Sequence, residues 1–304
     1  MTQYLDNIAL REAAFARLDQ LSLLYDECIP WAEIEKGFRF NDQVVPFASK
    51  AVGIFKPARL DVGALSIKKV VPKAGRVNVY ADSDSEDETG CFHYSLQGDN
   101  ADNHHNRLLS EAHDLRLPII YFYGVAPGIY RAIYPCYVDD IDGLFCQVSV
   151  SNRFSEAALR ETPYESDVIN RKYLLRETRV RLHQASFRSA VLAAYGNTCA
   201  MTGLPIPKLL DAAHIIPDAH PDGSASVDNG ICLSKIHHKA YDANLIGIDP
   251  DYRIHVSKEL LGATDGPILE LCLKGLHRQR IQLPRSQRHW PSRDALADRF
   301  AEFG

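Results

Sequence analysis

Residues 199–248 constrain the fold of this 304-residue chain more than any other stretch. Two short apolar runs, residues 211–217 and 228–233, are separated by a polar loop rich in Asp, Gly, Ser and Pro. Apolar runs of this length between turn residues predict strands. In the short segment that follows, His238 and Asp242 stand four residues apart, which places both side chains on one face of a helix. The stretch therefore predicts two strands followed by a helix.

These residue types suit the hydrolysis of a phosphodiester. The reaction needs a base that deprotonates water, a cation that steadies the charge on the phosphate and leaving oxygen, and a group that holds the base's ring. His214 ends the first apolar strand, and His238 and Asp242 are spaced to grip one cation. The pattern indicates a metal-dependent hydrolytic site.

The ordered series His214, Asn229 and His238 resembles the HNH nucleases, whose fold is a β-hairpin followed by a helix around one divalent metal. The resemblance extends beyond these three residues, both ahead of the hairpin and within it. The other matching positions are Gln184, Phe187, Arg188, Tyr195, residues 199–203 and 212–215, Gly230, Tyr241 and Asp242.

The resemblance implies a role for each site residue. His214 is the general base, Asn229 orients it through a hydrogen bond, and His238 binds the metal. Asp242 stands where many relatives carry a second ligand, and its carboxylate oxygen suits Mg²⁺ or Mn²⁺. Because Cys199 is not followed by a partner cysteine, we expect no structural zinc, and the turn at residues 199–203 should be held by packing.

Three neighbouring residues leave the ligand set open. Many HNH enzymes carry an Asp or His ligand immediately before the base, where this chain has Ala213. Asp211 lies three residues before the base, on the opposite face of a regular strand, so a structural role is open to it. His237 is an alternative to His238, because neighbours on a helix point about 100° apart and one of them faces inward. We prefer His238.

Residues 38–150 have a different sequence pattern, in which short runs of strand-favouring residues alternate with Gly, Pro, Asn and Asp. Several strands at such spacing predict a closed or nearly closed barrel. A succession of motifs here resembles the SRA domain, a barrel of the PUA superfamily that flips a modified cytosine out of duplex DNA. The motif residues are Gly90, Phe92, Tyr94, Ser95 and Gly98, then Asn106, Arg107 and Leu109, then the run 118–122, and then Gly128 and Tyr130.

This second resemblance implies a pocket for a flipped base. Such a base stacks on aromatic faces while polar groups read its edge, which repays a few kcal/mol of unstacking. Tyr80 and Tyr94 would be the stacking pair, Asp82 would accept from the exocyclic amine, and Ser95 would line the pocket. For the two tyrosines, core or cross-strand packing is the alternative.

Basic residues gather ahead of the HNH-like region, although the whole chain has a formal net charge of −5. Such a cluster neutralises DNA phosphates, and a solvated helix face is the alternative interpretation. The residues are Arg171, Lys172, Arg176, Arg179, Arg181 and Arg188.

We predict a two-domain α+β protein. Residues 1–150 form an SRA/PUA-like DNA-sensing β-barrel domain with an N-terminal helix, residues 151–170 a linker, and residues 171–304 an HNH endonuclease domain. The predicted function is restriction of double-stranded DNA that carries 5-methyl- or 5-hydroxymethylcytosine, with Mg²⁺ or Mn²⁺ as cofactor. The alternatives are an HNH endonuclease that reads unmodified sequence or a backbone modification, and a non-catalytic DNA reader with a decayed site.

The remaining expectations concern location and assembly. No apolar run approaches the ~18 residues that span a bilayer, and the N-terminus lacks the basic start and apolar core of a secretory signal. We therefore expect a cytoplasmic protein without a membrane partner. One HNH site cuts one strand, so double-strand cleavage implies a homodimer or two binding events.

Overall fold

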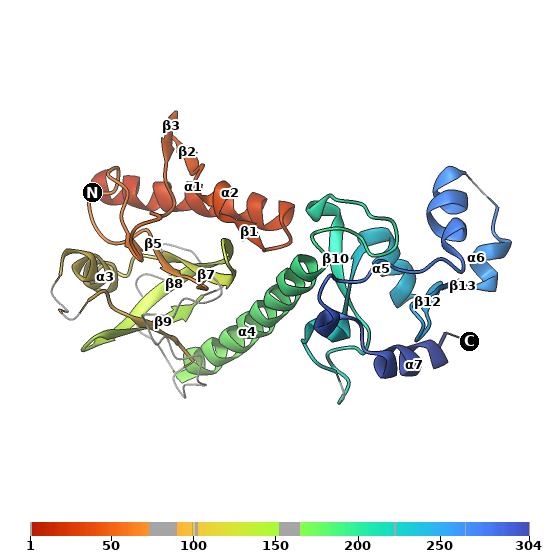
Figure 1. The fold of residues 1–304 in the computed structure, drawn as a ribbon. Helices are drawn as coiled ribbons and strands as arrows, with labels where there is room; N and C mark the ends of the chain where they lie inside the picture. Colours follow the sequence, from red (N-terminus) through yellow and green to blue (C-terminus); the bar gives the residue numbers. More distant parts are fainter. Residues whose placement is uncertain are drawn as a thin grey trace. The chain divides into compact units, whose positions relative to one another are not determined.

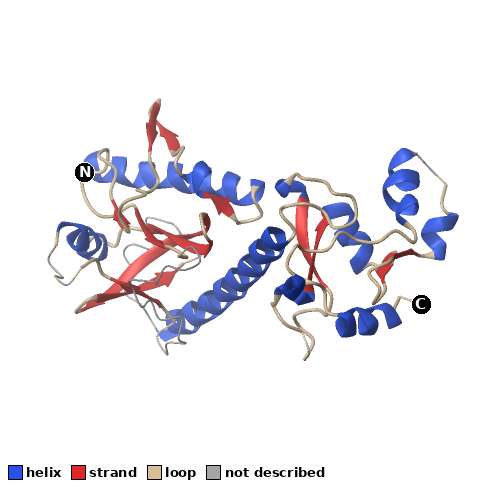
Figure 2. Ribbon diagram, viewed as in Figure 1, coloured by secondary structure: helices blue, strands red, loops and turns tan. Residues whose placement is uncertain are grey.

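The computed structural model contains helices and strands in both halves of the chain (Figures 1 and 2), which confirms the mixed α+β class. The chain divides into two compact units, Met1–Ala185 and Ser186–Gly304, and the division lies inside the long helix α4 (Glu165–Ala194). The predicted linker, residues 151–170, precedes that division and lies largely outside the described residues. The structure describes residues 2–72, 90–98, 100, 103–151, 165–221, 223–264 and 266–303.

The first unit is built on a mixed sheet that has seven strands among the described residues. Its strands are β1 (Ile29–Pro30), β4 (Ile54–Phe55), β5 (Ser66–Lys69), β6 (Phe92–Ser95), β7 (Ile119–Ala126), β8 (Ile129–Asp142) and β9 (Phe145–Val150). The main path is β4-β5-β7-β8-β9-β6, with β1 paired to β8, and of these strand pairs only β5 and β7 run parallel. Among the described residues, the edge strands β4 and β6 do not pair with each other, so a fully closed barrel is not seen within them.

Helices cover both faces of this sheet. Alternate residues of β7 point to opposite faces. Ile120 and Phe122 pack in one core with α1 (Thr2–Leu24), whereas Tyr121 packs in a second core with α3 (His104–Asp114) and the first half of α4. Burial on both faces explains the continuous apolar run in β7. On the α1 side the unit is completed by α2 (Trp31–Ile34) and the hairpin of β2 (Phe38–Phe40) and β3 (Gln43–Val45).

The second unit has its own core around the C-terminal end of α4. Its first half is a β-hairpin followed by a helix, and its second half is a small hairpin and short helices. The elements are η1 (Pro207–Leu209), β10 (Leu210–His214), η2 (Val227–Asn229), β11 (Gly230–Ser234), α5 (Lys235–Asp242), β12 (Ile246–Ile248), β13 (Ile254–Val256), α6 (Lys258–Gly262), η3 (Ile268–Leu273), η4 (Lys274–Leu276), η5 (Gln287–His289) and α7 (Arg293–Ala301). The predicted strand–strand–helix order is therefore confirmed for β10, β11 and α5.

The hairpin lies directly against α4, and one glycine allows the approach. A Cβ atom at Gly230 would stand 2.5 Å from Val191 Cγ2 and 2.9 Å from the Phe187 ring. Only a residue without a side chain fits there, so α4 packs close enough for Phe187 to reach the C-terminal end of β10. Among the described residues, no helix is both long and apolar enough to cross a membrane.

Candidate active site in the strand–strand–helix unit

The register of the hairpin sets the positions of the site residues. His214 ends β10 opposite Gly230, the first residue of β11. Helix α5 begins immediately after β11, because the Ser234 side chain accepts a hydrogen bond from the His237 backbone N–H and caps the helix. This short connection places the α5 side chains beside the first strand.

His214 has the properties of a general base. Its half-buried ring stacks on Phe187, with ring centroids 3.9 Å apart and an interplanar angle of 12°. Its Nε2 atom is buried and has no hydrogen-bond partner among the described residues. Burial lowers the pKa of His214, with partial compensation from the charge of Asp218. The imidazole is therefore neutral near pH 7, oriented by a stacked ring, and able to accept a proton.

Asn229 holds the loop that follows His214. Its side chain is buried, and its Oδ1 accepts from the Ile216 backbone N–H at 2.9 Å. Its Nδ2 donates to the carbonyl oxygens of Ile216, at 2.9 Å, and Ser224, at 2.8 Å. The predicted hydrogen bond from Asn229 to the His214 ring is absent from these contacts. Asn229 instead fixes the backbone two residues beyond His214, because its amide matches a donor and two acceptors of the main chain.

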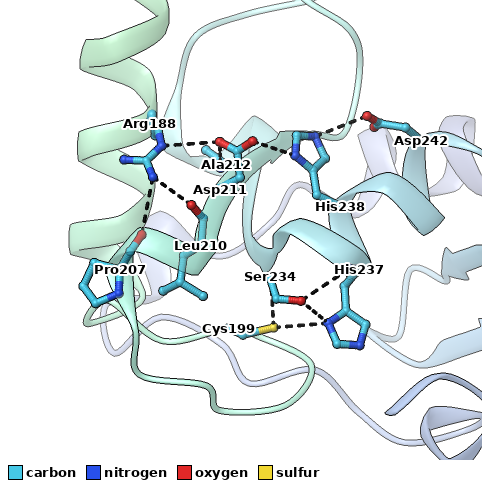
Figure 3. Close-up of polar contacts among 10 residues, drawn as sticks. All are labelled: Arg188, Cys199, Pro207, Leu210, Asp211, Ala212, Ser234, His237, His238 and Asp242. Atoms are coloured by element: carbon cyan, nitrogen blue, oxygen red, sulfur yellow. Dashed lines mark hydrogen bonds and ion pairs between the residues drawn. The ribbon is translucent and has the colours of Figure 1, made fainter. Parts of the chain in front are cut away.

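His238 lies between two carboxylates (Figure 3). Its Nδ1 is 3.0 Å from Asp211 Oδ2 on β10, and its Nε2 is 3.4 Å from Asp242 Oδ2 on α5. The hydrogen bond with Asp211 is the largest cause that raises the pKa of His238, with burial opposing it. Burial alone would raise the pKa of Asp211, but the hydrogen bond from His238 and the charge of Arg188 hold it below its ordinary value.

Asp211 is joined to α4 through Arg188. Arg188 Nε forms an ion pair with Asp211 Oδ1 at 3.4 Å, and Arg188 Nη2 donates to the Leu210 carbonyl at 2.7 Å. Strand alternation suggested that Asp211 points away from the site. Because α5 packs back onto β10, the carboxylate instead reaches His238 directly.

The prediction that Arg188 contacts DNA phosphates does not fit this placement. Its side chain is only 14% exposed, and its guanidinium faces Asp211 and the Leu210 carbonyl. The cation pairs with the half-buried carboxylate of Asp211 and is itself largely shielded from solvent. In the sequence Arg188 is one of several basic residues, and nothing there indicates that Asp211 is its partner.

His237, the alternative ligand, is hydrogen-bonded to other groups of the protein. It is 4% exposed, its Nδ1 lies 2.6 Å from Ser234 Oγ, and its Nε2 lies 2.8 Å from the Cys272 carbonyl. Both ring nitrogens are thus engaged within the protein, which favours His238 as the ligand. Cys199 Sγ lies 3.9 Å from His237 Nδ1 and accepts from the Ser234 backbone N–H at 3.3 Å.

This buried network ties the turn at residues 199–203 to the hairpin, where packing alone was predicted. Burial would raise the pKa of the Cys199 thiol, but hydrogen bonds, chiefly with His237, lower it to about 6. The pKa of His237 is raised in turn, against the opposing effect of burial. The Cys199 thiol and the His237 ring thus each shift the pKa of the other toward the charged form.

His238 and Asp242 form a donor pair that suits a hard divalent ion. No group of three or more His, Cys, Asp or Glu side chains in the described part of the chain is arranged to hold a metal. However, cis ligands about 2.1 Å from an octahedral ion lie roughly 3 Å apart, and Mg²⁺ is commonly held by one or two protein groups plus water and substrate phosphate. The 3.4 Å separation of His238 Nε2 and Asp242 Oδ2 is close to that spacing.

The predicted base pocket is only partly visible. Tyr80 and Asp82 lie outside the described residues. Tyr94 is 5% exposed and packs edge-on against Tyr121, with ring centroids 5.9 Å apart. Ser95 is half-buried at the end of β6. The structure thus gives Tyr94 the core position that was its alternative, because the sheet is covered on this face as well.

The basic residues of α4 fall into two groups. Arg171 forms an ion pair with Asp139 at 3.2 Å and is 23% exposed, while Arg179 is half-buried. Arg181 is exposed but forms ion pairs with Glu177 and, at 3.9 Å, with Glu27. The exposed cations of the predicted set are Lys172, Arg176 and Arg181.

Comparisons with known proteins bear mainly on the second unit. Among solved structures, a modification-dependent TagI restriction endonuclease is similar at 14% identity, over 79% of this chain and 82% of that chain, with a TM-score of 0.32. No curated protein matches the chain. Residues 199–249 match the HNH_2 family, described as HNH endonuclease. The match covers β10, β11 and α5, so this unit carries an HNH endonuclease domain and the protein is a nuclease.

Proposed function

We propose that this protein cleaves double-stranded DNA that carries 5-methyl- or 5-hydroxymethylcytosine, with Mg²⁺ or Mn²⁺ as cofactor, and so restricts modified DNA. One observation carries the catalytic half of the proposal: a neutral, stacked His214 lies at the end of the strand whose Asp211 contacts His238. This juxtaposition provides a base and a ligand pair within one strand–strand–helix unit.

The proton transfer is assigned to His214. Its Nε2, which has no partner among the described residues, takes a proton from the attacking water, and the stacked Phe187 keeps the ring from turning. His238 and Asp242 would hold the divalent ion, which supplies stabilisation for the charge on the phosphate and the leaving oxygen. Asn229 keeps the loop after His214 in place through the backbone of Ile216.

The DNA-sensing half of the proposal rests on the motifs of residues 38–150. Tyr80, Asp82 and Ser95 are proposed to contact the flipped base, through stacking, the exocyclic amine and the pocket wall respectively. The burial of Tyr94 against Tyr121 favours a core role for that residue.

The DNA backbone contacts are assigned to α4. The exposed cations Lys172, Arg176 and Arg181, with half-buried Arg179, can face phosphates from this helix. Because Arg171 is already paired with Asp139, we assign it a smaller share of the phosphate contacts. Because one HNH site cuts one strand, we propose that a homodimer makes the double-strand cut.

The test compares three matched plasmids: one unmodified, one with 5-methylcytosine and one with 5-hydroxymethylcytosine. Each is incubated with the protein and Mg²⁺ or Mn²⁺, with His214→Ala as the background control. The proposal predicts cleavage of modified DNA only, lost in the variant. Cleavage of all three plasmids would retain the nuclease and reject the modified-base sensor. Binding without any cleavage would identify a DNA reader.

A further inference from the structure

We propose that Asp211, oriented by Arg188, is a positioning residue that presents Nε2 of His238 to the catalytic cation. The inference rests on the proposed function, because it concerns the same site. It assigns a task to two residues that the sequence placed elsewhere: Asp211 away from the site and Arg188 on DNA.

The hydrogen bond between Asp211 and His238 determines the tautomer. In a neutral imidazole one nitrogen carries the proton and the other has the lone pair. Nδ1 lies 3.0 Å from a carboxylate oxygen, so the proton belongs on Nδ1, where it is donated to Asp211. The lone pair is then on Nε2, which faces Asp242 at 3.4 Å. Only this tautomer can bind a cation jointly with Asp242.

The carboxylate of Asp211 is itself held from two sides. Its Oδ1 accepts from the Ala212 backbone N–H at 2.9 Å and pairs with Arg188 Nε at 3.4 Å. Its Oδ2 faces His238. Arg188 in turn donates to the Leu210 carbonyl at 2.7 Å, which ties the guanidinium to the same strand. Because both of its carboxylate oxygens are engaged in this way, Asp211 is suited to hold the ring of His238 in place.

The neighbouring histidine shows what the arrangement achieves. His237 has the same residue type one position earlier, but Ser234 Oγ and the Cys272 carbonyl occupy its two nitrogens. Of the two, only His238 has one nitrogen held by the half-buried carboxylate of Asp211 and the other directed at a second carboxylate. Carboxylates that orient metal-binding histidines in this way typically contribute 10- to 100-fold to metal affinity.

The test uses the full chain with Asp211→Ala, Asp211→Asn and His238→Ala. Asp218→Asn is the matched control, because it also removes an exposed negative charge close to His214 but contacts neither His238 nor Arg188. Two quantities are measured: the Mn²⁺ dissociation constant by calorimetry, and the tautomer of His238 by ¹⁵N NMR of the metal-free protein at alkaline pH. Thermal unfolding of each metal-free variant checks that it folds.

We expect the wild-type ring to carry its proton on Nδ1. Asp211→Ala should weaken Mn²⁺ binding by about 10- to 100-fold and admit the Nε2–H tautomer, while Asp218→Asn changes neither. Asp211→Asn retains an acceptor oxygen and should rescue the tautomer and most of the affinity. If Asp211→Ala does not fold, the Asn variant and the wild-type tautomer decide.

Three results would overturn the inference: an Nε2–H tautomer in the wild type, a Mn²⁺ affinity that Asp211→Ala leaves unchanged, or no Mn²⁺ binding by the wild type. The inference would also be overturned if Asp211→Asn lost Mn²⁺ binding as completely as His238→Ala, because Asp211 would then be a direct metal ligand. These readouts do not require DNA cleavage. A protein that shows the expected tautomer and Mn²⁺ binding but cuts no plasmid would reject the proposed function and leave this inference standing.

Discussion

Removing the Asn229 side chain should loosen the loop that follows His214, the proposed general base. Asn229→Ala deletes three hydrogen bonds to the backbone of Ile216 and Ser224. Each such bond contributes about 0.5–1.5 kcal/mol net, and a buried group left without a partner costs about 1–3 kcal/mol. Because Ser224 is exposed and its carbonyl can recover a water partner, we expect a loss of about 2–4 kcal/mol in the free energy of unfolding of the second unit.

The assay is urea denaturation followed by the fluorescence of Trp290, which packs against the core of the second unit. The chain has two tryptophans, so a Trp31→Phe background isolates this signal. Asp228→Ala is the matched control, because Asp228 is the exposed neighbour of Asn229 in η2. Asn229→Asp provides a sharper variant, since it retains the acceptor for Ile216 N–H but turns a carboxylate toward two carbonyl oxygens.

We expect both Asn229 variants to lose stability and cleavage together, with Asn229→Asp at least as impaired as Asn229→Ala. The reasoning is refuted if Asn229→Ala is as stable as Asp228→Ala. Normal stability with lost cleavage would instead restore the sequence-based prediction, in which Asn229 acts on the His214 ring alone.

Three further predictions follow from the site. Phe187→Leu retains an apolar side chain but removes the ring stacked on His214, so single-turnover cleavage should slow by more than the loss of stability, measured as the melting temperature, can explain. The control is Leu192→Met, at another buried residue of α4; equal slowing of cleavage in that variant would contradict this. At saturating metal the cleavage rate should fall only below the ordinary histidine pKa of about 6.5, because burial lowers the pKa of His214 and the base works as the neutral form; an acid limb above that value would contradict it. Cys199→Ala should cost about 1–3 kcal/mol in chemical denaturation by leaving buried partners unsatisfied, whereas Cys272→Ala, at an exposed thiol, should cost little; similar losses would disprove the network's role.

The sequence was sufficient for the local architecture of the site. Apolar runs, turn residues and the spacing of His238 and Asp242 predicted a hairpin and a helix, and β10, β11 and α5 follow that order. Helical geometry predicted only that one of His237 and His238 faces inward, and the preference for His238 came from the HNH resemblance and its spacing to Asp242. Those inferences concern residues close together in the chain, where periodicity determines direction.

The partners of Asp211, Arg188 and Asn229 could not be read in the same way. The strand period gives the face on which Asp211 starts, but its contact with His238 depends on how α5 packs back onto β10. Arg188 has the composition of a DNA-binding residue, and only the packing of α4 against the hairpin turns it toward Asp211. Asn229 carries no sequence signal for which backbone groups its amide will meet.

The first unit shows the same limit. The continuous apolar run at residues 119–122 was an available signal for a sheet buried on both faces, and such a sheet places Tyr94 in the core instead of in an open pocket. The packing of α1 and α3 on the sheet therefore decides whether a tyrosine on a strand lies in the core or lines a pocket. The segment with Tyr80 and Asp82 lies outside the described residues, so their base-reading role stays a prediction.

The most direct test of the central claim is single-turnover nicking of supercoiled modified plasmid, comparing the wild type with His214→Ala at a Mn²⁺ concentration that saturates both proteins. We expect that removal of the proposed base slows nicking by about 10²- to 10⁴-fold while Mn²⁺ binding, measured by calorimetry, is unchanged. Nicking by His214→Ala at the wild-type rate would contradict the assignment of this residue, and with it the strand–strand–helix site, as the catalytic centre.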